Sequence, residues 1–239
     1  METLTGKIAA VTGGTRGIGR AIAERLLREG ASVAICGRER ASVDRAAAQM
    51  ASLGRVLGEP ADVTDVAQVR NFFLVIDREF GGLDILVNNA GGAVFRKVAE
   101  MTPEEWRRNI DLNLNGPFYC SREALSRFPQ RGGGFIVNIS SLAGKNPFSG
   151  GAGYNASKFG LNGFSEAMML DHRYENVRVS YIMPGSVNTG FAGDPAKRTG
   201  DASWMIAPED VAEAVAMVLR MPARTMVSRI EMRPSRPKK

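Results

Sequence analysis

Short apolar runs alternate with amphipathic stretches along almost the whole chain of 239 residues. The apolar runs have the length of buried strands, and the stretches between them place apolar residues at helical spacing. Parallel strands need crossover connections, and the connecting helices then cover both faces of the sheet. The pattern therefore predicts an α/β protein with a three-layer, doubly wound, mostly parallel sheet of about seven strands and helices on both faces.

The expected elements follow from this periodicity. Strands are expected at 7–12, 31–36, 56–60, 83–88, 135–140, 177–183 and 227–232, and helices at 17–29, 40–53, 66–80, 103–127, 154–174 and 208–219. We expect a single domain over 1–239, because the length and the 44% hydrophobic content suit one α/β core. An irregular segment at about 186–207, rich in Gly, Asp, Pro and Ser, is expected to form a substrate loop.

Cysteine usage and hydropathy restrict the class of protein. Only Cys36 and Cys120 occur, far apart and without metal-ligand spacing, so neither a disulfide framework nor a metal site is expected. The first residues carry an acid where a secretion signal carries bases, and no run approaches the ~18 apolar residues that span a bilayer. We therefore expect a cytoplasmic protein without membrane insertion.

The basic charge of the chain is concentrated near its C-terminal end. The formal net charge is +6 and the pI is near 9.6. From Met221 onward six basic residues face one acid, Glu231, so the remainder of the chain is nearly neutral. A solvated basic tail at 233–239 is the favoured interpretation, and contact with a partner or an anionic surface is the alternative. Nucleic-acid binding is not expected, because the chain has neither a basic body nor a recognised reader motif.

A glycine-rich turn, Thr12-Gly-Gly-Thr-Arg-Gly-Ile-Gly19, follows the first expected strand and opens the first expected helix. Glycines allow the backbone to turn sharply and to approach a pyrophosphate, while the helix N-terminus offers unpaired N–H groups and a positive dipole end. The strand–turn–helix context favours a dinucleotide site over a plain tight turn. The expected contacts are Gly13, Thr15, Arg16, Gly17, Ile18 and Gly19.

The end of the second expected strand bears on the choice of dinucleotide. Sites selective for NAD place an acid there, whereas this chain has Cys36-Gly37-Arg38. An arginine stabilises a 2′-phosphate by charge-assisted hydrogen bonds, and Arg16 in the glycine turn would add a second guanidinium. The sequence favours NADP(H), with NAD(H) as the second choice; the alternative is that both arginines are merely solvated.

Tyr154 and Lys158 lie four residues apart, downstream of Ser141. Residues at this spacing share one face of a helix. A nearby cation favours a phenolate, so we expect the ammonium to bring the pKa of Tyr154 down from ~10 toward neutral. Together with a dinucleotide site, this predicts proton transfer coupled to hydride transfer. Taken singly, each of these side chains also has an ordinary structural interpretation.

The motifs of this chain, in their order along the sequence, resemble those of the short-chain dehydrogenase/reductase family. They are the glycine turn, Asn88-Asn-Ala-Gly91, Asn113, Ser141, the Tyr154–Lys158 motif and Pro184-Gly185. The resemblance covers the chain from about residue 4 to residue 231, and its general character is that of 3-oxoacyl-carrier-protein reductases. It implies a one-domain Rossmann fold, a nicotinamide cofactor and, commonly, a homodimer or homotetramer. The chain departs from the family after the last strand, where it lacks the glycine-rich segment that often contributes to subunit contacts.

The resemblance also implies roles for single residues. Tyr154 corresponds to the acid/base, and Ser141 to the hydroxyl that orients the substrate oxygen. Lys158 corresponds to the group that binds the nicotinamide ribose and lowers the tyrosine pKa, and Asn113 to the position that holds a water of the proton relay. Further implied cofactor contacts are Arg38, Asp62, Val63, Asn89, Ala90, Gly91, Tyr154, Lys158, Pro184, Gly185, Val187 and Thr189. A purely structural role for Asn88 and an ordinary turn at Asp62 are the alternatives at those positions.

The substrate side is apolar and carries no distinctive charge at 93–95 and 147–149. Phe191, Trp204 and Met205 are expected to belong to a lid that excludes water, with ordinary packing as the alternative. His172 is expected to be a solvated or helix-end residue, not a catalytic one.

The predicted function is an NADP(H)-dependent oxidoreductase that transfers a hydride between nicotinamide and a carbonyl or secondary alcohol, with Tyr154 as acid/base. A ketone or 3-oxoacyl compound is the first choice of substrate. The alternative is a nucleotide-binding regulatory protein with little or no turnover.

Overall fold

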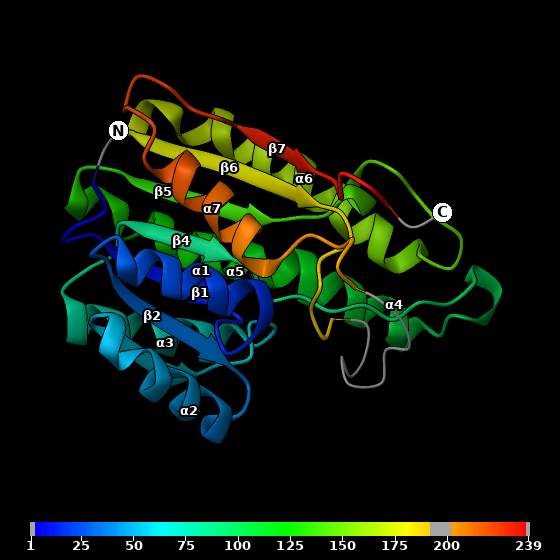
Figure 1. Ribbon diagram of the computed structural model, residues 1–239, viewed down its shortest axis with the longest axis horizontal. Helices are drawn as coiled ribbons and strands as arrows, with labels where there is room; N and C mark the ends of the chain where they lie inside the picture. The colour runs from blue at the N-terminus through cyan, green and yellow to red at the C-terminus, as the bar shows by residue number, and fades with distance from the viewer. Residues whose placement is uncertain (1–2, 192–201, 238–239) are drawn as a thin grey trace.

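Seven strands form one parallel sheet in the order β3-β2-β1-β4-β5-β6-β7 (Figure 1). The computed structural model describes residues 3–191 and 202–237. The strands are β1 (Ile8–Thr12), β2 (Ser32–Gly37), β3 (Val56–Pro60), β4 (Ile85–Asn88), β5 (Gly134–Ile139), β6 (Val177–Pro184) and β7 (Arg229–Met232). All six neighbouring pairs are parallel. The predicted fold class, a doubly wound parallel sheet with helices on both faces, is confirmed.

Helices connect successive strands in the part of the chain that the structure describes. They are α1 (Gly17–Arg28), α2 (Arg40–Met50), α3 (Val66–Phe80), α4 (Pro103–Ile110), α5 (Gly116–Leu125), α6 (Ala152–His172) and α7 (Pro208–Leu219). The bounds of β3, α3 and α7 are those predicted from periodicity. None of the described helices is long and apolar enough to cross a membrane.

The two faces of the sheet carry separate hydrophobic cores. Ala9 and Val11 of β1 pack with α1, α2 and α7, whereas Ile8 and Ala10 pack with α3, α5 and α6. Because successive strand residues point to opposite faces, a strand buried on both sides must be apolar throughout. This explains why the inner strands β2, β1 and β4 are nearly continuous apolar runs, whereas the edge strands β3 and β7 contain Glu59 and Glu231.

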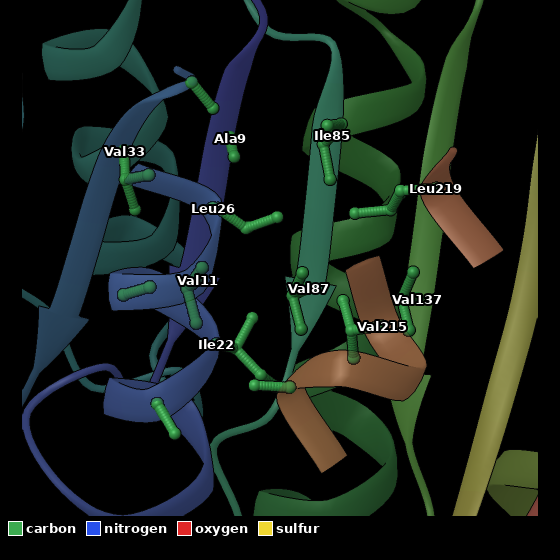
Figure 2. Close-up of a cluster of buried hydrophobic side chains, with 14 of the residues drawn as sticks. Ala9, Val11, Ile22, Leu26, Val33, Ile85, Val87, Val137, Val215 and Leu219 are labelled. Atoms are coloured by element: carbon green, nitrogen blue, oxygen red, sulfur yellow. The ribbon is translucent and has the colours of Figure 1, made fainter. Parts of the chain in front are cut away.

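The first of these cores holds α1 and α7 against the middle of the sheet. Figure 2 shows Ile22 and Leu26 of α1 and Val215 and Leu219 of α7 over the strand residues. Ile22 and Leu26 are fully buried, and burial of such a side chain contributes on the order of 2 kcal/mol. The core therefore sets the position of α1, and with it the position of the glycine turn that precedes this helix.

Two helices begin with side-chain caps of the kind that their sequences predict. The Asp65 carboxylate accepts from the backbone N–H of Ala67 at 2.8 Å at the start of α3. Thr102 and Glu105 form a capping box at the start of α4. Such caps satisfy backbone donors that have no partner within the helix. The first turn of α1, in contrast, has neither a side-chain cap nor an acidic residue.

The helical stretch predicted at 103–127 is present over 103–125, but it is not a uniform α-helix. A π-helical turn at Asp111–Asn115 separates α4 from α5. Pro117 has no N–H and cannot continue the α-helical ladder, and the side chain of Asn113 bonds outside the helix to the Gly92 carbonyl at 2.8 Å. π-Helical turns occur frequently at functional sites. This one brings Asn113 against the segment that follows β4.

The strand order changes direction at β1, which lies between β2 and β4. In doubly wound sheets, ligands bind in the crevice outside the carboxyl ends of the strands at such a switch point. The glycine turn after β1 and the Asn88–Gly91 segment after β4 both lie at this edge. The fold therefore brings together two motifs that are far apart in the sequence.

Candidate active site

The glycine turn is shaped by close backbone contacts. Gly13 and Gly17 have φ of +65° and +55°, values that residues with a β-carbon rarely adopt. A β-carbon at Gly13 would lie 2.9 Å from the Ala90 Cα, and one at Gly19 would collide with the Gly13 carbonyl. The uncapped start of α1 follows directly. These features fit a group that carries negative charge and needs the backbone to approach closely.

Thr12 and Asn89 fasten this turn to the end of β4. The Thr12 hydroxyl accepts from the backbone N–H groups of Asn89 and Ala90, both at 3.0 Å. The Asn89 side-chain amide donates to the carbonyls of Thr12 at 2.9 Å and Gly13 at 3.2 Å. The side chain of Asn89 thus holds the turn in shape. Thr12 was not among the predicted site residues, although its place as the first residue of the motif was a signal for it.

Asn88 has a structural environment. It is buried, and its amide donates to the Asn138 Oδ1 at 2.8 Å and the Ser121 hydroxyl at 3.0 Å. Asn138 in turn donates to the Ser165 hydroxyl at 2.8 Å. This polar chain ties β4 to β5, α5 and α6 inside the core. The structural alternative considered for Asn88 agrees with these contacts.

Arg16 and Arg38 lie at the neighbouring ends of the glycine turn and β2. The Gly14 N–H donates to the Cys36 carbonyl at 3.1 Å, which places the turn beside the end of β2. Both arginines are exposed, and within the described ranges neither guanidinium forms an ion pair or hydrogen bond. Two guanidiniums that have no partner among the described residues therefore belong to the ends of the glycine turn and β2.

Asp62 and Val63 follow β3 at the same edge of the sheet. The Asp62 carboxylate accepts from the N–H and the hydroxyl of Thr64 at 2.9 and 2.8 Å, as an ordinary turn requires. Val63 is buried. A β-carbon at Gly116 would lie 2.9 Å from a methyl group of Val63, so Val63 packs against the start of α5.

Tyr154 and Lys158 lie on one face of α6 and are 8% and 4% exposed. The Lys158 ammonium donates to the Ile139 carbonyl at the end of β5 at 2.9 Å, and it lies 5.8 Å from the centre of the Tyr154 ring. Ser141 follows β5, and its hydroxyl accepts from the Ala143 N–H at 3.1 Å. Three of the four predicted catalytic side chains, Ser141, Tyr154 and Lys158, are thus brought together where β5 meets α6.

Two asparagines of α6 hold the Ser141 segment against the helix. Asn155 donates to the Ala143 carbonyl at 2.6 Å, and Asn162 donates to the Gly144 carbonyl at 3.0 Å. The Ser140 hydroxyl donates to Asn162 at 2.5 Å. Sequence reasoning did not select these asparagines, because their partners are backbone carbonyls that only the fold brings near. The one available signal was their spacing along the same helix as Tyr154.

The protonation of Tyr154 differs from the expectation. Burial raises the pKa of Tyr154 above its ordinary value, and the Ser141 hydroxyl only partly offsets this shift. Burial also lowers the pKa of Lys158 to about 8. Burial thus favours the phenol over the phenolate, because a phenolate in this enclosed position would lose its hydration.

Asn113 is fully buried between the π-helical turn and the segment after β4. Its amide donates to the carbonyls of Gly92 and Asn109, both at 2.8 Å, and its Oδ1 accepts from the Gly92 N–H at 3.2 Å. A β-carbon at Gly91 would lie 3.1 Å from this Oδ1 and 4.0 Å from the Lys158 Nζ. Asn113 thus positions the backbone that faces Lys158.

The segment after β6 returns to the glycine turn. The Gly185 N–H donates to the Met232 carbonyl at 2.8 Å, and Pro184 is buried. Val187 and Ile206 form a parallel bridge that closes the base of the expected substrate loop. A β-carbon at Gly17 would lie 3.3 Å from a methyl group of Thr189, so Thr189 lies over the turn.

The middle of the expected substrate loop, residues 192–201, lies outside the described residues. Phe191 and Tyr154 have ring centres 5.7 Å apart, so the start of the loop reaches the phenol. Trp204 and Met205 are half-buried and line a hollow of about 470 Å³ together with 233–236 of the C-terminal tail. The tail therefore lies next to the loop; its last two residues, 238–239, are also outside the described ranges.

The remaining titratable groups singled out in the sequence lie elsewhere. His172 ends α6 and contacts the Glu175 carboxylate at 2.9 Å. Cys36 and Cys120 are buried, and burial raises the pKa of the Cys36 thiol to about 12. Among the described residues, no group of three His, Cys, Asp or Glu side chains is placed to hold a metal ion.

Comparison with known proteins decides the family. Residues 7–199 match the model of the short chain dehydrogenase family. The chain belongs to the short-chain dehydrogenases. This family assignment confirms the resemblance inferred from the motifs, and with it an oxidoreductase that uses a nicotinamide cofactor on CH–OH or C=O groups.

Relatives of this short-chain dehydrogenase match over most of their length. A 3alpha-hydroxysteroid dehydrogenase of Mediterraneibacter gnavus is 35% identical over 227 residues, which are 88% of each chain. An uncharacterized oxidoreductase of Staphylococcus aureus is 34% identical over 98% of this chain and 100% of its own.

Solved structures agree with the assignment. The alcohol dehydrogenase of the archaeon Thermococcus sibiricus, complexed with 5-hydroxy-NADP, superposes with a TM-score of 0.89 at 27% identity and covers 98% of this chain and 99% of its own. A metagenomic short-chain oxidoreductase in complex with NADP has a TM-score of 0.86 at 32% identity, over 99% and 100% of the two chains. The short-chain dehydrogenase described above thus shares its whole fold with proteins that hold a nicotinamide dinucleotide.

Proposed function

We propose that this short-chain dehydrogenase is an NADP(H)-dependent reductase of ketones or 3-oxoacyl compounds, which also oxidises the corresponding secondary alcohols. The observation that carries the proposal is the buried phenol of Tyr154 beside Ser141 and Lys158 at the edge of the sheet that holds the glycine turn. A substrate with a hydroxyl or carbonyl group is supported by the names of two similar proteins. The Mediterraneibacter relative is a hydroxysteroid dehydrogenase, and the Thermococcus protein is an alcohol dehydrogenase.

The glycine turn and the start of α1 would bind the pyrophosphate, and Arg16 and Arg38 would bind a 2′-phosphate. The NADP-bound neighbours support this choice of cofactor. Asp62 and Val63 would border the adenine, Ala90 and Gly91 the adenosine side, and Val187 and Thr189 the nicotinamide side. When bound, the nicotinamide supplies or accepts a hydride at the substrate carbon.

The catalytic side chains have complementary roles in the proposed reaction. In reduction, Tyr154 donates its proton to the carbonyl oxygen as the carbon gains a hydride, so that C=O becomes CH–OH. Ser141 donates a hydrogen bond to the same oxygen and stabilises the charge that develops on it. The Lys158 ammonium stabilises the phenolate that Tyr154 leaves behind, and the phenolate then regains a proton from solvent. In oxidation, these steps run in reverse.

Two further properties follow the family resemblance. We propose a homodimer or homotetramer, and the exposed apolar side chains of Trp106, Phe118 and Phe159 on α4, α5 and α6 support contacts between subunits. We also propose a cytoplasmic location, which suits two free, buried cysteines.

Reduction of a substrate panel tests the proposed function. Consumption of NADPH would be followed with simple ketones, 3-oxoacyl thioesters, quinones and sugar ketones. We expect turnover of at least one carbonyl class. NADPH binding without turnover of any of them would overturn the proposal in favour of a nucleotide-binding regulatory protein.

The pH dependence of the free enzyme tests the role of Lys158. Because its pKa is lowered to about 8, we expect kcat/KM for NADPH to decline as the pH rises through this value and the ammonium loses its charge. The same shift makes the buried charge unfavourable to folding below about pH 8, and this cost is relieved as the pH rises toward the ordinary lysine value of 10.5.

The control for this prediction is Lys158→Met. Its kcat/KM is expected to be low and to lack the decline near pH 8, since its side chain cannot titrate. An unchanged decline in the methionine variant would show that another group is responsible.

A further inference from the structure

Three phenylalanines from separate segments form a connected group of rings with Tyr154. The ring centres of Phe95 and Tyr154 are 5.8 Å apart at an angle of 90°, and those of Phe191 and Tyr154 are 5.7 Å apart. Phe148 contacts Phe95 at 5.6 Å in an edge-to-face arrangement. Phe95 follows β4, Phe148 follows β5 and Phe191 follows β6, so each of the three segments beside the site contributes one ring. We call these three side chains the aromatic wall.

The aromatic wall leaves apolar surface open to water beside a buried reactive group. Phe95, Phe148 and Phe191 are 40%, 47% and 42% exposed, whereas Tyr154 is 8% exposed. Large exposed apolar surface that gathers around a few polar groups is typical of a ligand site, because covering it removes water from the rings. A ligand that reaches the Tyr154 hydroxyl would therefore cover these rings.

Backbone contacts hold Phe95 in place. On its N-terminal side, the N–H and the carbonyl of Val94 both bond to the Asn109 side chain, at 3.0 and 3.1 Å. On its C-terminal side, the Arg96 N–H donates to the Gly150 carbonyl at 2.8 Å. The last contact also joins the Phe95 segment to the Phe148 segment.

Phe148 is held from the side of α6. Its N–H donates to the Asn155 Oδ1 at 3.4 Å, and its carbonyl accepts from the Gly151 N–H at 3.1 Å. A β-carbon at Gly151 would lie 2.7 Å from the Phe148 ring, so the ring occupies space that only glycine leaves free. Phe95 and Phe148 are thus positioned before any ligand binds, which reduces the entropy lost on binding.

Two basic residues near the wall in the sequence are already paired, whereas Lys97 is exposed. Arg96 lies 3.5 Å from the Glu105 carboxylate, and Lys145 lies 2.6 Å from that of Glu231. Neither side chain is positioned as a free cation for an anionic substrate. The rings that contact Tyr154, those of Phe95 and Phe191, offer apolar aromatic surface.

We propose that the substrate is a ketone, or the corresponding secondary alcohol, with a flat or ring-shaped apolar group next to the reacting carbon, and that the aromatic wall binds this group. The inference rests on the proposed function, in which the carbonyl carbon gains a hydride from NADPH and the oxygen gains the Tyr154 proton. Edge-to-face contacts with the rings would orient the apolar group and so direct the carbonyl oxygen toward Tyr154 and Ser141. Phe95, Phe148 and Phe191 would thereby determine specificity.

Paired substrates measure this preference. Acetophenone and acetone are both methyl ketones and differ by a phenyl group in place of a methyl group; pyruvate carries a carboxylate instead. We expect Phe95→Ala and Phe191→Ala each to lower the ratio of kcat/KM for acetophenone to that for acetone by about tenfold, since a ring contact is lost. Pyruvate is expected to be a poor substrate of the wild type and of both variants.

Leu74→Ala is the matched control. Leu74 is 53% exposed on α3, so this variant also removes an exposed apolar side chain, but one that does not belong to the wall. Its substrate ratio is expected to equal that of the wild type. Phe95→Leu keeps an apolar side chain of similar bulk and removes the ring, and it provides the same test if the alanine variant does not fold.

A binding measurement separates the substrate class from the reaction itself. Calorimetric titration of acetophenone into the NADPH-loaded Tyr154→Phe protein needs no turnover, and Phe191→Ala in this background is expected to weaken binding about tenfold. If the wild-type protein binds acetophenone but reduces no carbonyl compound, the role of the aromatic wall is supported and the proposed function is overturned. If the protein reduces acetone or pyruvate, and Phe95→Ala and Phe191→Ala leave the substrate ratio unchanged, only the proposed role of the aromatic wall is overturned.

Discussion

Replacement of Tyr154 by phenylalanine is expected to lower kcat by about 10²–10⁴-fold, the range that a positioned acid/base contributes. NADPH affinity should stay close to that of the wild type, because the substitution removes one hydroxyl and keeps the ring. The ring retains its contacts with Phe95 and Phe191, so the surrounding site is preserved. Steady-state kinetics of carbonyl reduction and a direct titration of NADPH binding provide the two measurements.

Tyr174→Phe is the control for this prediction. Tyr174 is 92% exposed in the short helix that follows α6, so loss of its hydroxyl should leave kcat unchanged. A Tyr154→Phe variant with full activity would show that another group delivers the proton, and the catalytic assignment would then have to be abandoned.

Replacement of Arg38 by aspartate is expected to lower kcat/KM for NADPH by about 10–100-fold and to raise that for NADH. A charge-assisted hydrogen bond contributes about 1.5–3 kcal/mol, and the new carboxylate would repel a 2′-phosphate and accept from a 2′-hydroxyl instead. Arg38 has no protein partner within the described ranges, so its removal breaks no internal contact. Initial rates with both cofactors measure the switch.

Arg45→Asp makes the same change of charge on the exposed face of α2 and is the matched control. Its cofactor ratio should remain that of the wild type, apart from a small long-range effect that salt screens. Arg16→Ala should weaken NADPH more than NADH, since Arg16 would contact the same phosphate. A wild-type preference for NADH would contradict the proposed cofactor choice.

Much of the fold could be predicted because burial on both faces leaves its mark on local sequence. The strands β1, β2, β4, β5 and β6 are mainly apolar runs, and the helices between the strands carry apolar residues at helical spacing. The helical stretch at 103–127 was predicted as well, but the π-helical turn within it was not. At this turn the Asn113 side chain bonds to Gly92, a residue distant in the sequence.

The residues of the candidate site also fall into a group that the sequence predicts and a group that only the fold reveals. Its motif residues could be selected from sequence because glycines at a strand–helix turn and the Tyr154–Lys158 spacing are local patterns. Other residues of the site were harder to recognise from the sequence, because each acts through a partner that only the fold brings near. These residues are Thr12, Asn109, Asn155 and Asn162. Their contacts determine where the selected residues lie relative to one another.

By itself, the sequence determined the order of strands and helices, the glycine turn and the chemical groups available for proton transfer, since each depends on residues close together in the chain. Only the tertiary structure decided the direction of the pKa shift of Tyr154, which burial raises although a lysine stands nearby. It also decided that Phe95 and Phe191 contact this phenol and that Phe148 contacts Phe95. The physical reason is that hydration and ring contacts depend on which distant segments pack together, and neighbours in the chain do not specify this.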